Sequence, residues 1–158
     1  SKHWEIYTEW EKENCGTYFR NNVWGWKPLW MFVTAMCNDI LTEKDIASGY
    51  FNDGHKISKT KAGRIAKKLY NLIEKGYVEA YESARERAHD SLEQIDCRIC
   101  DATGKRQEPP MIGAGDIECN GCNGTGKKDH PDKSYPFWED NVRQFANFCA
   151  NSGGFEIC

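Results

Sequence analysis

The chain has 158 residues, a formal net charge of −3 at pH 7 and aromatic residues at 13% of its positions. This composition excludes global disorder, and the negative charge argues against a generally basic nucleic-acid binder. No apolar run is long enough to span a membrane, and the charged, Trp-rich start does not resemble a signal peptide. We therefore expect a cytoplasmic protein.

The first third of the sequence contains one ambiguous segment and one predicted helix. The opening "HWEIYTEWEKEN" places Trp4, Tyr7 and Trp10 three residues apart, which fits one face of a helix, although "WEIY" is also compatible with a strand. Pro28 suits the first turn of a helix. We expect that helix to start near Pro28 and to run through "LWMFVTAMCNDIL".

The strongest helix signal follows a predicted turn at Asp53 and Gly54. Ser58 is placed to cap the helix, and Gly76 is placed to end it. The apolar residues between them recur at the three-and-four spacing of an amphipathic helix. They are Ala62, Ile65, Ala66, Leu69, Leu72 and Ile73.

A second helical pattern begins at Val78, and the composition then changes. Residues 97–136 are rich in Gly, Pro, Asn, Asp and Lys and poor in apolar residues, so this stretch cannot build its own core. The last helix is expected within "WEDNVRQFANFCANS", followed by a short strand at "FEIC". One face of that helix carries Val142, Phe145, Ala146 and Cys149.

Four of the eight cysteines stand in two similar stretches, "CRICDATGKR" and "CNGCNGTGKK". Thiolates separated by two residues on a tight turn can face one ion, and two such turns complete the tetrahedral site that zinc prefers. Four protein ligands close the site, so we expect one structural zinc ion; a dithiol or redox pair is the alternative. The predicted ligands are Cys97, Cys100, Cys119 and Cys122.

The other four cysteines are scattered along the chain. We expect them to be free thiols that are mostly buried as small apolar side chains. They are Cys15, Cys37, Cys149 and Cys158.

These elements predict a mostly α fold with minor β structure. We expect a single helical domain with an inserted four-cysteine zinc knuckle. Residues 1–96 would form the helical N-terminal body and residues 97–136 the knuckle. Residues 137–158 would supply a C-terminal helix and a short strand that pack on the body.

The cysteine stretches resemble a known repeat. "CNGCNGTG" matches the C-x-x-C-x-G-x-G repeat of the DnaJ-type cysteine-rich domain, and "CRICDATG" matches it with Ala102 at the first glycine. Such repeats bind zinc in pairs, so the two repeats imply one ion.

The chain as a whole is similar to a group of small phage and bacterial proteins with a DnaJ-like zinc finger. The similarity rests on "YFRNNVWGWKPLW", "NDG", the paired cysteine turns and "YPFWEDNVRQFANFCANSGGFEIC", in this order. It implies the architecture, a phage or prophage origin and a location in the host cell cytoplasm. It does not supply a reaction.

The stretch "YFRNNVWGWKPLW" has two interpretations. It is either a wedge of the core or a binding surface, because flat rings beside amide and guanidinium donors suit a nucleotide-like ligand or a partner protein. The paired asparagines have a further interpretation as turn residues bonded to the backbone. The candidate binding residues are Tyr18, Arg20, Asn21, Asn22, Trp24, Trp26 and Lys27.

We therefore predict a non-enzymatic, zinc-stabilised binding protein. It would be a phage-encoded accessory or inhibitor protein that engages a host protein or sequesters a nucleotide-like small molecule.

Two alternatives remain open. The first is nucleic-acid binding through the basic helix 56–75, although such a face is also typical of solvated residues paired with acids elsewhere. Its candidate residues are Lys61, Arg64, Lys68 and Lys75. The second is an unrecognised enzyme, for which Asp53 and His55 are the candidate acid–base pair.

Overall fold

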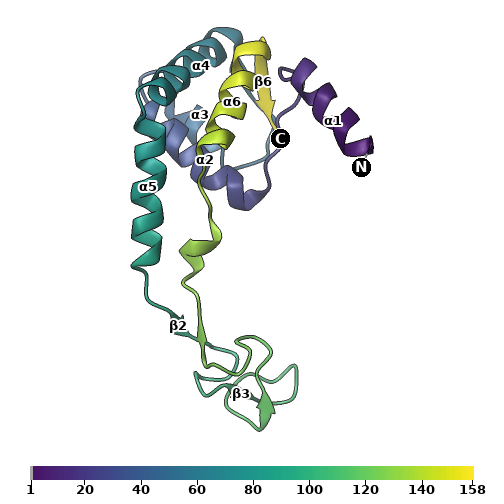
Figure 1. The fold of residues 1–158 in the computed structure, drawn as a ribbon, viewed down its shortest axis with the longest axis vertical. Helices are drawn as coiled ribbons and strands as arrows, with labels where there is room; N and C mark the ends of the chain where they lie inside the picture. Colours follow the sequence, from purple (N-terminus) through teal and green to yellow (C-terminus); the bar gives the residue numbers. More distant parts are fainter. Residues whose placement is uncertain (1) are drawn as a thin grey trace. The chain divides into compact units, whose positions relative to one another are not determined.

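The computed structural model describes residues 2–158, apart from the side chains of residues 2–4, 6, 7 and 11. The described chain is mostly helical with short strands, as predicted (Figure 1). It divides into two compact units, so a single domain is not confirmed. One unit comprises the chain up to Arg85 together with Tyr135–Cys158, and the other comprises Glu86–Ser134.

The helices of the first unit are α1 (Lys2–Glu13), α2 (Val23–Met36), α3 (Glu43–Ser48), α4 (Lys59–Glu74), α5 (Tyr77–Asp90), which continues into the second unit, and α6 (Glu139–Asn151). Its strands are β1 (His55–Ser58) and β6 (Gly154–Ile157). The second unit holds β2 (Ile95–Asp96), β3 (Lys105–Arg106), β4 (Ile117–Glu118), β5 (Lys127–Lys128) and a 3-10 helix (Pro131–Ser134). No helix in the described part of the chain is long and apolar enough to cross a membrane.

The ambiguous N-terminal segment is helical and forms α1. The side chains of Trp4 and Tyr7 lie outside the described residues, so their predicted shared face stays a prediction.

Helix α2 begins earlier than the sequence predicted. The Asn22 side chain accepts a hydrogen bond from the backbone N–H of Gly25 at 2.9 Å and caps a helix whose first residue is Val23. Pro28 lies inside α2, where it removes one backbone hydrogen bond, and the prediction that it starts the helix is wrong. The helix ends at Met36 and does not continue through "CNDIL".

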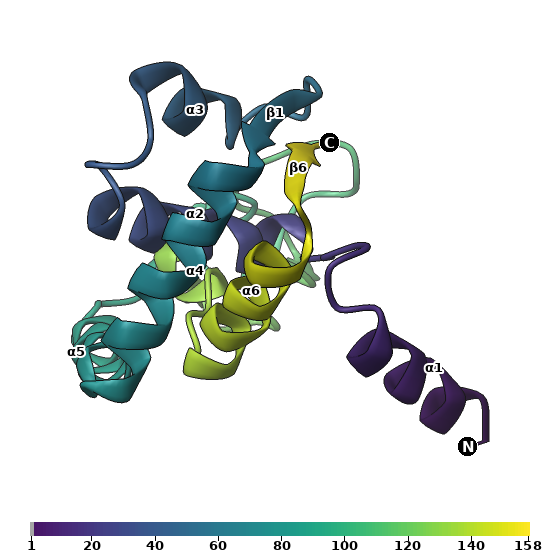
Figure 2. The same cartoon turned by 90° about the horizontal axis from the view of Figure 1, so that it is seen from above.

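Helices α4 and α6 pack against each other in the centre of the core, and Figure 2 shows them side by side. Ser58 caps α4 by accepting a hydrogen bond from the N–H of Lys61 at 3.2 Å. Gly76 follows the end of α4 with a φ of 78°, as expected of a helix-ending glycine. The predicted stripe of α6 is buried: Val142, Phe145, Ala146 and Cys149. In the predicted stripe of α4, Ala62, Ile65, Ala66 and Leu69 are buried, whereas Leu72 and Ile73 are half-buried against the core.

The predicted C-terminal strand forms, and its partner was not predicted. Strand β6 pairs antiparallel with β1, so that Ile57 lies opposite Phe155. The predicted turn at Gly54 is present with a φ of 79° and leads into β1. Helix α3 was also missed, although Thr42 and Asp45 form a capping box at its start.

A buried carboxylate fastens α3, β1 and α4 together. The Asp45 side chain is 5% exposed and accepts a hydrogen bond from the backbone N–H of Thr42 at 2.9 Å. It also contacts His55 Nε2 at 2.7 Å and the ammonium group of Lys61. Burial raises the pKa of Asp45, but these hydrogen bonds outweigh burial and hold the pKa well below its usual 3.8. The stabilisation is therefore complete above that pH and is lost as the pH falls through the lowered folded-state pKa.

Replacement of this carboxylate tests its role. We expect Asp45→Asn to lower the free energy of unfolding at pH 7 by about 2–4 kcal/mol, because Lys61 and His55 lose their partner. The difference in free energy of unfolding between Asp45→Asn and the wild type should become smaller as the pH falls below 3.8, because Asp45 of the unfolded wild type is then protonated. Chemical denaturation at a series of pH values measures both effects.

Asp39→Asn is the matched control. Asp39 pairs with Lys68 at 3.6 Å, and its side chain is 55% exposed, so its loss should cost less than about 1 kcal/mol. Equal costs for the two variants would contradict the structural role of Asp45.

Candidate functional site

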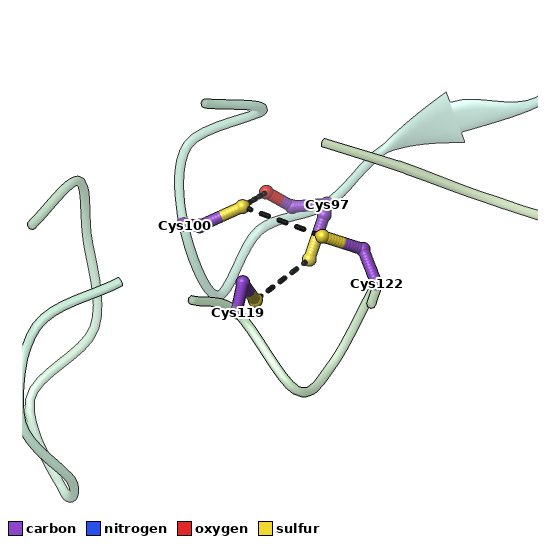
Figure 3. A group of neighbouring side chains, drawn as sticks. All are labelled: Cys97, Cys100, Cys119 and Cys122. Carbon is purple, nitrogen blue, oxygen red and sulfur yellow. Dashed lines mark hydrogen bonds between the residues drawn. The ribbon is translucent and has the colours of Figure 1, made fainter. Parts of the chain in front are cut away.

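The four cysteines predicted as metal ligands lie together in the second unit. Their Sγ atoms lie within 4.8 Å of one another, and all four residues are buried. Cys97 and Cys119 are separated by 3.9 Å between sulfurs, and Cys100 and Cys122 by 3.8 Å. Four sulfurs about 2.3 Å from a central ion would be about 3.8 Å apart, whereas a disulfide bond is about 2.05 Å long. Figure 3 shows the sulfurs turned toward one another, as a tetrahedral metal site requires.

The two cysteine stretches form one repeated structure in which each completes the other. The backbone N–H of Cys97 donates to the carbonyl of Gly126 at 2.9 Å, and the N–H of Cys119 donates to the carbonyl of Gly104 at 2.9 Å. The strands pair in the same reciprocal way. Strand β2, which precedes the first stretch, pairs with β5 at the end of the second, and β4, which precedes the second stretch, pairs with β3 at the end of the first. The near-repetition in the sequence is thus a pseudo-two-fold arrangement around the sulfurs.

The threonine after each second cysteine holds its turn closed. Thr103 Oγ1 donates to the carbonyl of Cys100 at 2.7 Å and accepts from the N–H of Lys105 at 3.2 Å. Thr125 Oγ1 makes the same bonds, to the carbonyl of Cys122 at 2.7 Å and from the N–H of Lys127 at 3.3 Å. The hydroxyl therefore fixes the path from the cysteine to the following strand in both stretches.

Two glycines donate their backbone N–H groups to sulfurs. Gly104 N lies 3.3 Å from Cys100 Sγ, and Gly126 N lies 3.2 Å from Cys122 Sγ. A Cβ at Gly104 would lie 2.3 Å from the carbonyl oxygen of Gly124, and both Gly104 and Gly126 have positive φ, at 81° and 77°. Only glycine fits these positions, which explains the second glycine of the C-x-x-C-x-G-x-G repeat.

Burial and the contacts among the sulfurs shift the pKa values of Cys100 and Cys122. Burial and the neighbouring cysteines raise the pKa of Cys100 to about 11, against the hydrogen bond from Gly104. Burial also raises the pKa of Cys122, but the Gly126 N–H and the other three cysteines outweigh burial and lower this pKa to about 6. A metal ion binds cysteine in its thiolate form, so metal binding releases the protons that the cluster carries.

The other cysteines are free thiols, and Cys37 and Cys149 are buried. Burial raises the pKa of Cys37 to about 11 and also raises that of Cys149. Cys15 is half-buried and Cys158 is exposed. The two inner thiols act as small apolar core residues.

The first unit contains a cavity of about 530 Å³ beside the predicted binding stretch. Tyr18, Arg20, Asn21 and Trp26 line it, whereas the other three predicted binding residues do not. The remaining walls come from residues 49–52, α6 and the chain through β6. Sequence reasoning missed the contribution of these segments, because they are remote along the chain.

The paired asparagines serve the fold. The side-chain amides of Asn21 and Asn141 exchange two hydrogen bonds, at 2.8 and 2.9 Å, which tie the stretch to α6. Asn22 caps α2 through a hydrogen bond to the backbone, which agrees with the interpretation of the asparagines as residues bonded to the nearby backbone. Asn141 was missed, although an asparagine beside the apolar stripe at Val142 and Phe145 is a detectable signal for a buried polar contact.

The tryptophans of the same stretch divide between core and surface. Trp30 is fully buried and donates to the carbonyl of Ile46, while Trp26 stacks on Trp30 at 5.2 Å between ring centroids. Trp24 is 47% exposed and contacts the ring of Tyr135 at 5.0 Å. Lys27 extends over the same Tyr135 ring, with Nζ 4.9 Å from its centroid. The stretch is thus partly a core wedge and partly an exposed surface.

Only some of the residues predicted to bind nucleic acid are free to contact phosphate groups. Lys61 pairs with Asp45 and Lys68 with Asp39, so two of the four cations face acids of the same unit. Arg64 is exposed on α4, and Lys75 caps its end.

The candidate acid–base pair is arranged differently from the prediction. Asp53 accepts a hydrogen bond from the backbone N–H of His55 at 3.2 Å, as in a tight turn. The His55 ring contacts Asp45, which belongs to the structural cluster of α3.

Comparison of the chain with protein-family models, curated proteins and solved structures finds no match.

The one departure from the repeat offers a test of the knuckle geometry. Ala102 has a φ of 63°, at the position where the other stretch has Gly124 with a φ of 78°. We expect Ala102→Gly to stabilise the metal-loaded protein by about 0.5–1 kcal/mol, because glycine avoids the strain of a Cβ in the left-handed region. Thermal unfolding with metal bound measures the change.

The reciprocal variant should have the opposite effect. A Cβ at Gly124 would lie 2.9 Å from Glu118 Oε1, so Gly124→Ala should lower the free energy of unfolding of the metal-loaded protein by about 1–2 kcal/mol. Destabilisation by both substitutions would contradict the equivalence of the two stretches.

Proposed function

We propose that the protein is a non-enzymatic, zinc-stabilised binding protein that sequesters a small molecule in the cavity of its first unit. The cavity carries this proposal: about 530 Å³ is within the range of small-molecule sites, and four of the predicted binding residues line it. The zinc part rests on the four buried sulfurs. All-thiolate tetrahedral sites suit zinc or iron, and a closed set of four cysteines is the usual structural zinc site.

The binding stretch is well anchored for this role. A Cβ at Gly16 would lie 2.2 Å from the carbonyl oxygen of Asn151, so the chain lies directly against the end of α6. Phe19 packs on Phe145 and Phe148, with ring centroids 5.3 and 5.9 Å apart. Together with the Asn21 amide pair, these contacts fix one wall of the cavity before any ligand arrives, which lowers the entropic cost of binding.

A host protein is the second candidate partner, and the outer face of α2 favours it. Val23, Trp24 and Met31 are 66%, 47% and 50% exposed, and Lys27 lies on the same helix. An exposed tryptophan beside other apolar side chains is typical of protein contact sites. An accessory or inhibitor protein fits either partner, and the family resemblance implies the phage origin and the host-cytoplasm location of such a protein. Nucleic-acid binding is less favoured, since Lys61 and Lys68 already have acidic partners.

Metal analysis tests the zinc centre. We expect one zinc per chain in the wild type and loss of metal in Cys119→Ser, because three thiolates and a hydroxyl bind zinc much more weakly than four thiolates. Metal content by mass spectrometry gives the result, with Cys158→Ser as the control at an exposed cysteine. Iron in place of zinc, or full metal content in Cys119→Ser, would contradict the assignment.

Native mass spectrometry tests the cavity. We expect the wild type to retain a bound small molecule from the cell, and Thr17→Trp to lose it, because Thr17 lines the cavity and the larger ring would fill part of it. Thr60→Trp, on an exposed position of α4, should keep it. A wild type that carries zinc and nothing else would contradict small-molecule capture and favour the host protein.

A further inference from the structure

The polar groups that line the cavity fall into two classes. The Asn21 amide, Trp26 Nε1 and Ser152 Oγ are engaged within the protein, the last two with the carbonyls of Gly49 at 2.7 Å and Cys149 at 3.3 Å. The side chains of Tyr18, Arg20, Tyr50 and Asn52 have no hydrogen-bond partner within the described part of the chain. These four groups are therefore free to bind a ligand.

The charged side chains of the cavity constrain the chemistry of that ligand. Among the side chains of the described lining residues, Arg20 is the one cation and Glu156 the one carboxylate. A free guanidinium binds phosphate through two parallel hydrogen bonds, and no acid neutralises Arg20 in the described chain.

Glu156 selects a different feature of the ligand. An ionised carboxylate only accepts hydrogen bonds, and Glu156 receives one from the weak donor Cys158 Sγ at 3.5 Å. Its unused acceptor sites suit N–H groups, and a second anionic end would be repelled.

The apolar walls suit a flat ring. Phe148 and Phe155 contact each other at 5.2 Å between ring centroids, and both line the cavity together with Phe19 and Trp26. Aromatic side chains bind planar rings by offset stacking or edge contacts. The volume of about 530 Å³ exceeds what a single aromatic amino acid fills and leaves room for a base, a sugar and one phosphate.

We propose that the cavity binds a nucleoside monophosphate whose base carries an amino group, with the phosphate on Arg20 and the base N–H groups on Glu156. This inference rests on the proposed small-molecule capture and specifies its ligand class. The phosphate supplies the anion, the base supplies the flat ring, and the amino group supplies the donors for the carboxylate. Tyr18, Tyr50 and Asn52 are available for the sugar hydroxyls.

Isothermal titration calorimetry of the zinc-loaded protein tests the proposal with GMP, AMP, guanosine and inorganic phosphate as probes. We expect GMP or AMP to bind, guanosine to bind about ten- to a hundredfold more weakly than GMP, and phosphate alone not to bind measurably. Arg20→Gln should remove the difference between GMP and guanosine, whereas Arg20→Lys should keep part of it. Arg143→Gln is the control, since Arg143 pairs with Glu139 on α6 outside the lining residues.

The failure of this inference can be distinguished from the failure of the proposed function. Suppose that neither GMP nor AMP binds, while native mass spectrometry still shows a bound small molecule in the wild type and none in Thr17→Trp. The nucleotide assignment is then overturned, and small-molecule capture stands. Equal affinity for GMP and guanosine, or unchanged GMP binding in Arg20→Gln with native helical circular dichroism, would also overturn the role of Arg20. Absence of both nucleotide binding and any bound mass would overturn both.

Discussion

The second unit depends on four sulfur atoms that a tetrahedral ion would hold about 3.8 Å apart. The strands around them are two residues long, and Ile95 and Ile117 are exposed, so apolar burial contributes little to this part of the chain. The turns close only because hydroxyls, glycine N–H groups and reciprocal backbone bonds all converge on the cysteines. In such a unit the free energy of metal binding is also the free energy of folding.

The first unit is stabilised in another way. Helices α2, α4 and α6 supply its apolar core, and polar contacts help to fasten other segments to that core. Asp45 attaches α3 and β1 to α4, and the amide pair of Asn21 with Asn141 attaches the aromatic stretch to α6. The cavity lies beside this second attachment, so the same residues that order the stretch also shape the proposed ligand site.

Features with a local physical cause were predictable from the sequence. The spacing of the cysteines predicts the cluster of four sulfurs that could hold a metal ion, and the apolar stripe with Ser58 as cap and Gly76 at the end predicts α4. The predicted start of α2 at Pro28 was wrong, because the fixed φ of proline also fits a position inside a helix. Asn22, which precedes Pro28, caps this helix. The partners of Asn21, His55 and Trp26 are decided by packing between segments that are separated along the chain, so a single sequence does not specify which residues pair. For that reason the aromatic stretch could not be divided into core, cap and cavity wall beforehand.

Backbone hydrogen exchange, followed by mass spectrometry with and without a strong zinc chelator, tests the central claim most directly. If the ion holds the second unit, chelation should remove protection from residues 97–128, while α4 and α6 keep theirs because their protection comes from apolar packing. Protection of residues 97–128 that persists after complete metal removal would contradict the account. Loss of protection in α4 and α6 together with the knuckle would contradict it equally, because the two units would then share one source of stability.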